Sequence, residues 1–338
     1  MNGGRPQKYL ELAERIKDMI VSCRLRRGDL LPPERKFAEM LGCSHLTLRK
    51  ALQLLEKDNL IHVIPSRGRF VGPRPHDETK QASIGFLIPN SDPFYFRIFT
   101  LLENHLYTRN LHPVVHVSDG SRTKEAALLQ TAEEQHLAAL VAVPNPQCAD
   151  QYAALGIPVT FFDYPLPGLQ RPCVVCDDYE GARAAVDYLV GTGARRIAHI
   201  GGLYNPACED RLHGYLDSLA KHDLPRHEAW IVRDTPTREA GLYAARALFE
   251  SKGPQPEAIL CCNDAVAAGV VHYFARRGEA PCRLIGFGNT SVAEDLGISS
   301  VDQHTDKIAG LILRNLQLLL NGEKPPLKTV VPTELIIR

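Results

Sequence analysis

The chain has 338 residues, too many for one small core and enough for two or three domains. Its apolar content of 44% is that of a soluble globular protein, and no apolar run approaches the roughly 18 residues of a membrane span. The first residues, MNGGRPQKYLELAERI, contain no apolar signal-peptide core. We therefore expect a cytoplasmic protein without a membrane partner.

Charge is distributed unevenly along the chain. The net charge is zero, but residues 1–75 hold 15 Lys and Arg against 8 Asp and Glu, so this part carries +7 and the rest −7. A basic head on an acidic body predicts a polyanionic partner for the head alone. Charge by itself leaves a chance surface imbalance as the alternative.

The nine cysteines form no disulfide framework. Cys173 and Cys176 have CxxC spacing, but there is no second pair and no nearby His, and alternating residues of a strand would not present both thiols to a metal. We expect reduced, mostly buried thiols, with no metal site and no cofactor.

The first 71 residues predict three helices followed by two short strands. Apolar residues recur at helical spacing over 8–23, and a second helix, 34–41, begins after two prolines and ends at Gly42. Ser44 is the expected N-cap of a third helix that runs to about residue 58. Two β-like runs, 60–64 and 69–71, flank the basic turn Pro65-Ser66-Arg67-Gly68. This order is typical of a winged helix-turn-helix, whose recognition helix enters the major groove.

The start of the third helix exposes donors for phosphates and base edges: His45, Thr47, Arg49 and Lys50. A solvated polar helix face is the alternative interpretation of the same pattern.

Residues 31–71 resemble the DNA-binding domain of GntR-type bacterial regulators. The segments that carry the resemblance are LPPERKFAEMLGCSHLTLRKAL and SRGRFV, which follow the family pattern of helices, turn glycine and wing. The resemblance implies that Arg35, Thr47 and Arg49 contact DNA and that the wing tip reaches the minor groove. Together with the cap and the exposed donors, the predicted DNA-binding residues are Arg35, Ser44, His45, Thr47, Arg49, Lys50, Arg67 and Gly68.

Three positions depart from the GntR pattern. Pro33 stands in place of the usual capping Ser, and His45 in place of an Arg that the family uses at the recognition helix. Ser66 replaces the first wing glycine, which predicts a slightly different wing tip.

Beyond the head, residues 72–82 contain two prolines and no periodicity, which indicates a linker. From residue 84 short apolar runs alternate with helical segments, the pattern of parallel sheets covered on both faces. The predicted strands are 84–89, 114–117, 139–143, 159–162, 197–200, 230–232, 258–261 and 283–287. The predicted helices are 96–109, 124–135, 151–155, 179–192, 210–222, 238–250 and 264–276. Two α/β lobes of similar size are expected.

Polar and aromatic residues follow the predicted strands, at the edge where such sheets bind ligands. They are residues 92–95, Asp163, Asn263 with Asp264, and Gly288 with Asn289, while Arg211 opens a predicted helix after a Gly-Gly turn. This mixture suits a small polyhydroxylated ligand, although each residue alone could be a cap or turn residue. An unpaired charge at Asp163 or Arg211 would be costly beside buried elements.

The body resembles the effector domain of LacI/GalR-type repressors, which is similar to periplasmic sugar-binding proteins. Segments that carry the resemblance include IGFLIPNSDPFY, VVCDDYEGARAAVDYLV, AILCCNDAVAAG and LIGFGNTSVAEDLGISSVDQ. It implies an effector cleft lined by Phe94, Tyr95, Asp163, Arg211, Asn263 and Gln303. One departure is the sequence GFGN at 286–289, where the family usually has GFDD with an acid that binds sugar hydroxyls.

The predicted fold class is therefore α/β: a two-lobed periplasmic-binding-protein-like domain with parallel sheets, preceded by a small α+β winged helix-turn-helix domain. The predicted divisions are 1–71 for the DNA-binding domain, 72–82 for the linker and 83–338 for the effector and dimerisation domain. Within the last, lobe one is about 83–176 and 304–328, and lobe two about 177–303 and 329–338. A GntR-type head on a LacI-type body resembles the architecture of bacterial arabinose repressors.

These features predict a sequence-specific transcriptional repressor that binds a double-stranded DNA operator as a homodimer and responds to a sugar or sugar derivative. A nucleoside-like effector is second, because of Phe94 and Tyr95. The sequence lacks GxSxG, Walker, HExxH and GxGxxG motifs, so we do not expect an enzyme. The competing hypotheses are a cytoplasmic sensor module whose basic head contacts a protein, and an enzyme with a DNA tether. We expect the effector to weaken DNA binding; its identity and the operator sequence stay open.

Overall fold

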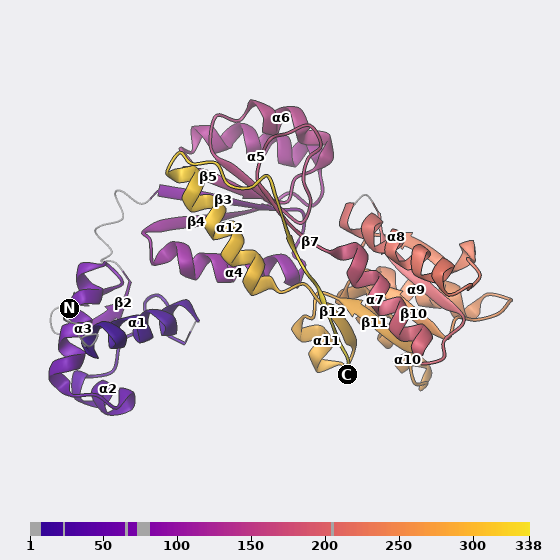
Figure 1. Cartoon of the computed structure of the whole chain (residues 1–338), viewed down its shortest axis with the longest axis horizontal. Helices are drawn as coiled ribbons and strands as arrows, with labels where there is room; N and C mark the ends of the chain where they lie inside the picture. The colour runs from indigo at the N-terminus through magenta and orange to yellow at the C-terminus, as the bar shows by residue number, and fades with distance from the viewer. Residues whose placement is uncertain (1–7, 23, 65–66, 73–81, 204–205) are drawn as a thin grey trace, which may run out of the picture. The chain divides into compact units, whose positions relative to one another are not determined.

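The computed structural model describes residues 8–22, 24–64, 67–72, 82–203 and 206–338 (Figure 1). The chain divides into two compact units, one of residues 1–89, 97–159 and 313–324, the other of residues 90–96, 160–312 and 325–338. Most of the predicted linker and two wing residues, Pro65 and Ser66, lie outside the described residues. In the described part of the chain, no helix is long and apolar enough to cross a membrane.

The head folds as three helices and a two-stranded wing: α1 (Lys8–Val21), α2 (Glu34–Leu41), α3 (His45–Lys57), β1 (Ile61–Ile64) and β2 (Gly68–Val71). The wing strands pair antiparallel, with Ile61 opposite Val71. One apolar cluster holds these elements together, and among its members Ile16, Phe37, Leu48 and Leu55 are almost fully buried. The predicted order of elements is confirmed.

Local signals set the ends of the helices in the head. Gly42 ends α2 with φ of 65°, a left-handed conformation that glycine adopts without strain. Ser44 caps α3, since its hydroxyl accepts a hydrogen bond from the Thr47 backbone N–H at 3.1 Å. Pro33 precedes α2 and provides no side-chain cap, so this departure from the GntR pattern leaves the helix start uncapped by a side chain.

The first six-stranded sheet has the order β13-β7-β6-β5-β3-β4. Its strands are β3 (Ala82–Ile88), β4 (Leu111–Val117), β5 (Ala139–Ala142), β6 (Val159–Phe162), β7 (Cys173–Cys176) and β13 (Lys328–Val331). Every residue of β5, β6 and β7 is buried, as expected of parallel strands covered on both faces. The helices that flank this sheet are α4 (Pro93–Tyr107), α5 (Arg122–Glu134), the 3₁₀ turn η2 (Pro146–Cys148), α6 (Ala149–Ala154) and α12 (Thr305–Leu320) (Figure 1).

The second six-stranded sheet has the order β14-β12-β11-β10-β8-β9. Its strands are β8 (Ile197–Gly202), β9 (Ile231–Asp234), β10 (Ala258–Cys261), β11 (Arg283–Phe287), β12 (Ser299–Asp302) and β14 (Glu334–Ile336). β14 runs antiparallel to β12, and the other pairings are parallel. The associated helices are α7 (Asp178–Gly191), α8 (Pro206–Lys221), η3 (Glu228–Trp230), α9 (Arg238–Glu250), α10 (Asp264–Arg277) and α11 (Ser291–Asp295).

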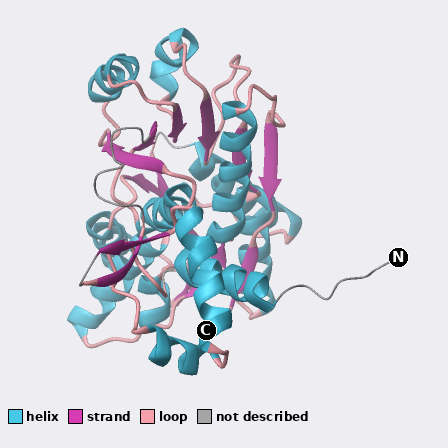
Figure 2. Ribbon diagram, turned by 90° about the vertical axis from the view of Figure 1, so that its left-hand side faces the viewer, coloured by secondary structure: helices cyan, strands magenta, loops and turns pink. Residues whose placement is uncertain are grey.

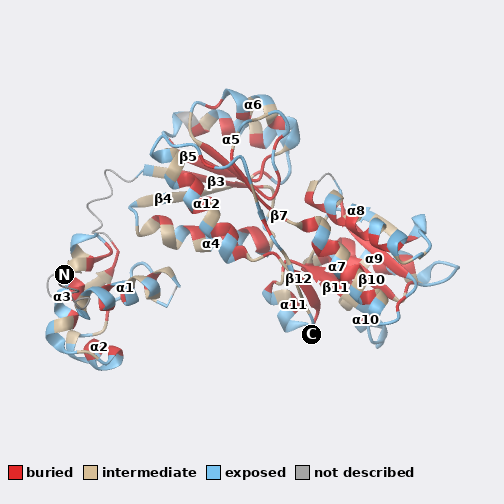
Figure 3. Cartoon of the chain, in the orientation of Figure 1, coloured by how far each residue is buried: buried red, intermediate tan, exposed pale blue. Residues whose placement is uncertain are grey.

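Helices cover both faces of the second sheet, and each face has its own core. One apolar cluster joins α7 and α8 to the strands through residues such as Val186 and Tyr215. The other joins α9 and α10 to the opposite face and includes Trp230 and Val266. Figure 2 shows strands flanked by helices, and Figure 3 shows burial concentrated on the strands.

The predicted alternation of strands and helices, and with it the α/β fold class, is confirmed. Two differences concern the second half of the chain. α8 begins at Pro206, four residues before the predicted start, so Arg211 lies within the helix and does not open it. Proline fits at this first helical position because its missing N–H has no partner there. The segment after residue 288 adds α11, β12, α12, β13 and β14, which the strand and helix patterns did not reveal.

A glycine allows α7 and α8 to approach closely. A Cβ atom added to Gly214 of α8 would lie 2.3 Å from the Tyr179 carbonyl oxygen of α7. The backbone of one helix therefore occupies the space that a side chain on the other would need.

We predict that Gly214→Ala destabilises the protein by about 1–3 kcal/mol, because the two helices must separate to admit a methyl group. Gly310→Ala is the matched control: this glycine also lies inside a helix, α12, and a Cβ there has no neighbour within 4 Å. Alanine favours helix by up to about 1 kcal/mol over glycine, so the control should be neutral or stabilising. Urea unfolding measures both, and equal stability of the two variants would contradict the close-approach argument.

Candidate functional site

The predicted DNA-binding residues lie on the exposed side of the head. Arg35 is exposed on α2, and the first turns of α3 expose His45, Arg49 and Lys50, with Thr47 half-buried. Arg67 and Gly68 are exposed at the beginning of β2. The buried face of α3 is formed by Leu48, Ala51, Leu52 and Leu55. One helix thus separates core residues from basic and hydroxyl side chains.

An ion-pair network that the sequence analysis missed ties the wing to the helices. Arg69 of β2 pairs with Glu34 of α2, and its Nε donates to Glu56 of α3 at 2.6 Å. Burial disfavours the charged guanidinium, but its hydrogen bonds to Glu56 and Glu34 raise the pKa of Arg69. An Arg in the wing and an acid in the first turn of α2 were the available signals, but they lie 35 residues apart.

His45 joins the same network. Its Nε2 lies 2.7 Å from the second carboxylate oxygen of Glu34. The residue that replaces the family's arginine is therefore held by an acidic side chain at the start of the recognition helix. A base contact from Nε2 requires this pair to separate first.

The second candidate site lies within the second unit and begins with Tyr95 and Asp163. The Tyr95 hydroxyl donates to Asp163 Oδ2 at 2.9 Å. Asp163 follows β6 with φ of 74°, and its backbone N–H bonds the Val174 carbonyl of β7. Phe94 and Phe162 pack edge-on against the Tyr95 ring. Burial, with the nearby Asp163 charge, raises the pKa of Tyr95, so the phenol stays protonated.

Arg211 forms the centre of this site. Its Nε and Nη2 bond Asp178 Oδ1 at 2.9 and 2.8 Å, and Nη1 donates to the Cys262 carbonyl. The guanidinium lies 4.0 Å from the centre of the Phe287 ring, a cation–π contact. The Gln303 amide donates to the same Asp178 oxygen at 3.4 Å. Asp178 is thus a residue of the site that the sequence analysis did not assign.

Asn263 performs a structural and a bridging task at once. Its Oδ1 accepts from the Val266 N–H and caps α10, while its Nδ2 donates to Asp92 Oδ2 at 2.9 Å and to the Pro236 carbonyl. Asp92 in turn accepts from the Phe94 backbone N–H. The structure thus brings the predicted effector residues together in three linked groups: Tyr95–Asp163, Arg211–Asp178–Gln303, and Asn263–Asp92–Phe94.

The carboxylates outnumber the cations in this site. Burial raises the pKa of Asp178 to about 7, against the opposing charge of Arg211 and with a further increase from Asp163. Burial also raises the pKa of Asp92, against the backbone hydrogen bond from Phe94 and the amide of Asn263. The one guanidinium is already neutralised, so the cluster disfavours an additional negative charge.

The GFGN segment itself supplies no carboxylate at the position next to Gln303, whose amide bonds Asp178 instead. A Cβ added to Gly288 would lie 4.0 Å from Gln303 Oε1 and 3.6 Å from Asp264 Oδ2. Gly288 has φ of 116°, a conformation that side chains strongly disfavour. The Asn289 side chain bonds Asp302 and Arg338.

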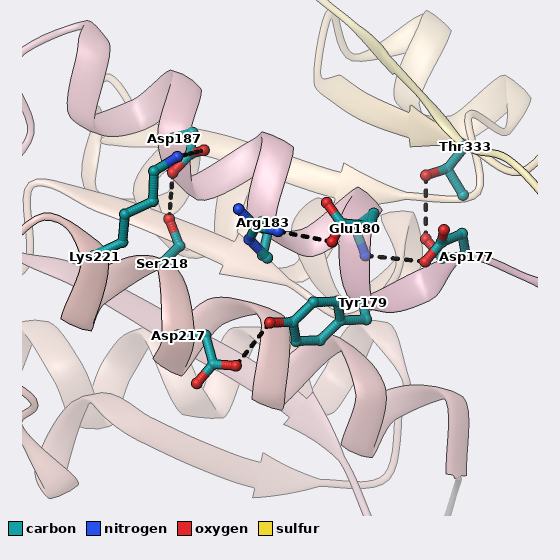
Figure 4. Close-up of polar contacts among 9 residues, drawn as sticks. All are labelled: Asp177, Tyr179, Glu180, Arg183, Asp187, Asp217, Ser218, Lys221 and Thr333. Carbon is teal, nitrogen blue, oxygen red and sulfur yellow. Dashed lines mark hydrogen bonds and ion pairs between the residues drawn. The ribbon is translucent and has the colours of Figure 1, made fainter.

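Polar side chains join α7 to α8 (Figure 4). The Tyr179 hydroxyl donates to Asp217 at 2.7 Å, and Asp187 accepts from Ser218 and Lys221 at 2.6 and 2.7 Å. At the start of α7, the Asp177 side chain caps the helix by accepting from the Glu180 N–H. These contacts join the two helices that carry Asp178 and Arg211.

Comparison with known protein families matches both parts of the chain. Residues 8–71 match the bacterial regulatory proteins of the gntR family, and residues 186–338 match the periplasmic binding protein-like domain. The two resemblances stated from the sequence are confirmed.

Two relatives are regulators of sugar metabolism by name. The chain is 25% identical over 312 residues to the arabinose metabolism transcriptional repressor of Geobacillus stearothermophilus, covering 88% of this chain and 82% of that protein. It is 28% identical over 202 residues to the ribose operon repressor of Bacillus subtilis, covering 58% of this chain and 59% of that protein.

Two solved structures share the fold of the body. A periplasmic binding protein/LacI transcriptional regulator from Alkaliphilus metalliredigens, complexed with D-xylulofuranose, has a TM-score of 0.68 and 26% identity, covering 76% of this chain and 98% of that one. The Escherichia coli transcriptional repressor ascG has a TM-score of 0.64 and 22% identity, with coverage of 76% and 98%.

The raised pKa of Asp178 predicts a pH dependence of stability. A carboxyl group whose pKa is raised on folding binds more protons folded than unfolded between its two pKa values. The free energy of unfolding therefore falls as pH rises from about 4 to about 7, by at most about 1.4 kcal/mol per pKa unit. We expect Asp178→Asn to flatten this slope in urea unfolding measured at about pH 5 and about pH 7.5.

Glu257→Gln is the control for this measurement. The backbone N–H groups of Arg195 and Arg196 lower the pKa of the half-buried Glu257, a shift opposite in sign to that of Asp178. The slope should be unchanged in this variant. A slope equally steep in Asp178→Asn and in the unmodified protein would contradict the assignment to Asp178.

Proposed function

We propose that this chain, a transcriptional regulator that joins a gntR-family DNA-binding domain to a LacI-type periplasmic-binding-protein-like body, represses transcription from an operator and is controlled by a small effector. We further propose a sugar or sugar derivative as the effector, with Asp163, Asp178, Arg211 and Gln303 as its polar partners. The observation that carries this proposal is the buried cluster around Arg211 in a body whose fold is that of LacI-type regulators.

Operator binding by the head is supported by α3, which has one exposed basic face and one buried apolar face. The first turns of α3 expose Arg49 and Lys50, while Leu48 and Leu52 of the same helix are buried in the core. Basic and hydroxyl groups on an exposed recognition helix are suited to phosphates and to base edges in the major groove. The exposed Arg67 places a further cation at the wing.

The chemistry of the second site favours a neutral hydroxylated ligand. Carboxylates accept hydrogen bonds from hydroxyl groups, and the Gln303 amide can donate and accept. Arg211 is committed to Asp178 and to the Cys262 carbonyl, so it offers little to a phosphate. The rings of Phe94 and Tyr95 are at most 8% exposed and pack edge-on against each other, which favours a sugar over a nucleoside base.

We propose that the regulator acts in the cytoplasm as a homodimer. A helix-turn-helix dimer reads two half-sites about 34–36 Å apart or a multiple of that distance. An effector that changes the geometry of the dimer then changes operator affinity, and a coupling of about 1–3 kcal/mol corresponds to roughly 5–150-fold.

Operator binding should depend on Arg49. We expect Arg49→Ala to reduce specific DNA binding by more than about tenfold, since a bidentate contact to a base contributes about 1–3 kcal/mol. Footprinting on a promoter fragment selected with the unmodified protein, followed by titration at several salt concentrations, measures the loss.

Arg246→Ala is the control for DNA binding. Arg246 is an exposed arginine of α9 that pairs with Glu250, far along the chain from the head. The Arg246→Ala variant loses one positive charge, as Arg49→Ala does, and should leave the footprint intact. Equal affinity of Arg49→Ala and the unmodified protein, or binding insensitive to salt, would instead support a protein partner for the head.

Effector binding should depend on Asp163. In a thermal-shift screen of arabinose, ribose, xylulose, their phosphates and nucleosides, we expect a neutral sugar to raise the unfolding temperature. A ligand present at a concentration of about 100 times its Kd raises the free energy of unfolding by about 2.7 kcal/mol through mass action. Asp163→Asn should abolish the shift, because the substitution turns one of the two acceptor oxygens into an NH2 donor and removes the negative charge, while Tyr95 already occupies one acceptor.

Asp119→Asn is the control, because this exposed carboxylate pairs with Lys124 within the other unit. It should retain the thermal shift. Stabilisation by a phosphorylated sugar in preference to its neutral form would contradict the charge argument, and a nucleoside hit would replace the sugar class.

A further inference from the structure

Two cysteine thiols lie together beside Arg211 and have no role in the function proposed above. Cys208 is on α8, three residues before Arg211, and Cys262 directly follows β10. Both side chains belong to one buried apolar cluster, and the two thiols are close enough to affect each other's pKa. The Cys262 carbonyl also accepts from Arg211 Nη1. The thiol pair is therefore connected to the candidate effector site through one residue.

The fold explains why residues 54 positions apart in sequence meet here. β8 and β10 are parallel neighbours, and the Cys262 N–H continues their ladder by donating to the Ile200 carbonyl at 2.8 Å. Cys208 extends over the end of β8, where a Cβ added to Gly202 would lie 2.7 Å from its sulfur. The glycine thus leaves the space that the Cys208 sulfur occupies.

The surroundings give the two thiols different chemistry. The hydrogen bond from Cys262, then Arg211 and the Gly202 backbone, lower the pKa of Cys208 in spite of burial. Cys208 also lies in the first turn of a 16-residue helix, where the helix dipole favours a thiolate. The same hydrogen bond, together with burial, raises the pKa of Cys262. One sulfur is suited to attack an oxidant and the other to remain a thiol until it is needed.

Other buried cysteines lack this combination. Burial raises the pKa of Cys261, and burial raises that of Cys173 and Cys176 on β7 as well. Among the cysteines in the described part of the chain, a lowered pKa, a neighbouring thiol and a position in the first turn of a helix coincide only at Cys208.

We propose that Cys208 and Cys262 form a redox-active dithiol that a small hydroperoxide converts to an intramolecular disulfide beside the effector site. The Cys208 thiolate attacks the peroxide, the O–O bond breaks, and a sulfenic acid forms while the leaving oxygen departs as alcohol, or as water from hydrogen peroxide. The Cys262 thiol then attacks the Cys208 sulfur, and the hydroxide leaves as water with the Cys262 proton. The two thiols lose two electrons, which reduce the peroxide.

The disulfide would join the N-terminal turn of α8 to the end of β10. Arg211 is bonded to both elements, through its own helix and through the Cys262 carbonyl. Oxidation therefore restrains the guanidinium and its contact with Asp178. Exposed fractions of 5% for Cys208 and 1% for Cys262 restrict the reaction to a small oxidant.

The test treats the full chain with hydrogen peroxide, alkylates the remaining free thiols in denaturant and maps the peptides by mass spectrometry. We expect one disulfide, between Cys208 and Cys262, that a dithiol reductant reverses. Trp230, the sole tryptophan in the sequence, lies in the same apolar cluster as both cysteines, so its fluorescence provides the time course.

Cys208→Ser and Cys262→Ser should each lose the disulfide and slow the fluorescence change by more than about tenfold, while retaining the circular dichroism of the unmodified protein. Cys148→Ser is the control: it removes an equally buried cysteine from the other unit and should react like the unmodified protein.

Two results would overturn the proposal. One is a chain that keeps all its thiols at a peroxide dose that oxidises the unfolded protein. The other is a mapped disulfide that uses Cys261 or Cys282. Both results are measured on the unmodified protein, so they remain decisive even if a variant fails to fold. Neither depends on the identity of the effector.

Discussion

The buried ion pair between Asp178 and Arg211 is the interaction on which the second unit depends. Both side chains are at least nine-tenths buried, so transfer from water costs several kcal/mol per charge. The cost is offset by hydrogen bonds to Asp178 Oδ1, by the Cys262 carbonyl and by the face of Phe287. Removing either partner would leave an uncompensated charge, which costs about 3–5 kcal/mol.

The same pair links features that are separate in sequence. Asp178 begins α7 and Arg211 lies in α8, while the carbonyl that receives Arg211 follows β10 and the amide that reaches Asp178 follows β12. A ligand that bonds Asp178 or Gln303 therefore acts on two helices, α7 and α8, and on the segments that follow β10 and β12. Under the proposed function, these bonds would transmit effector binding beyond the site, and a bond between the neighbouring thiols would act on the same residues.

The sequence predicted the head more completely than the body because the signals of the head are local. Gly42, Ser44 and the apolar spacing of α3 determine helix ends and faces within a few residues. The ion pairs of Arg69 join residues up to 35 positions apart, and no local pattern indicates them. The recognition helix was thus predictable, whereas the restraint on His45 was not.

In the body, Asp178 escaped prediction because it follows Asp177, and a pair of acids before a helix is typical of capping. The structure separates their tasks: Asp177 caps α7, and Asp178 is buried against Arg211. Gln303 was assigned only through family resemblance, since the polar sequence of β12 (Ser299–Asp302) gives no strand pattern. β12 is held in the sheet by pairing with β11 and β14, and this long-range pairing determines the position of Gln303.

The GFGN segment shows how a backbone conformation can change the chemistry of a ligand site. Asp264 accepts hydrogen bonds from Ser300 and from the Thr290 hydroxyl and N–H, which hold the loop that contains Gly288. With φ of 116° at Gly288, a carboxylate could be added there only at the cost of strain, so its absence is part of the loop conformation. The proposed ligand would then meet Gln303 and bare backbone where related regulators present an acid. Discrimination among sugars at that edge would depend on the Gln303 amide, on the nearby carboxylates of Asp178 and Asp264, and on shape.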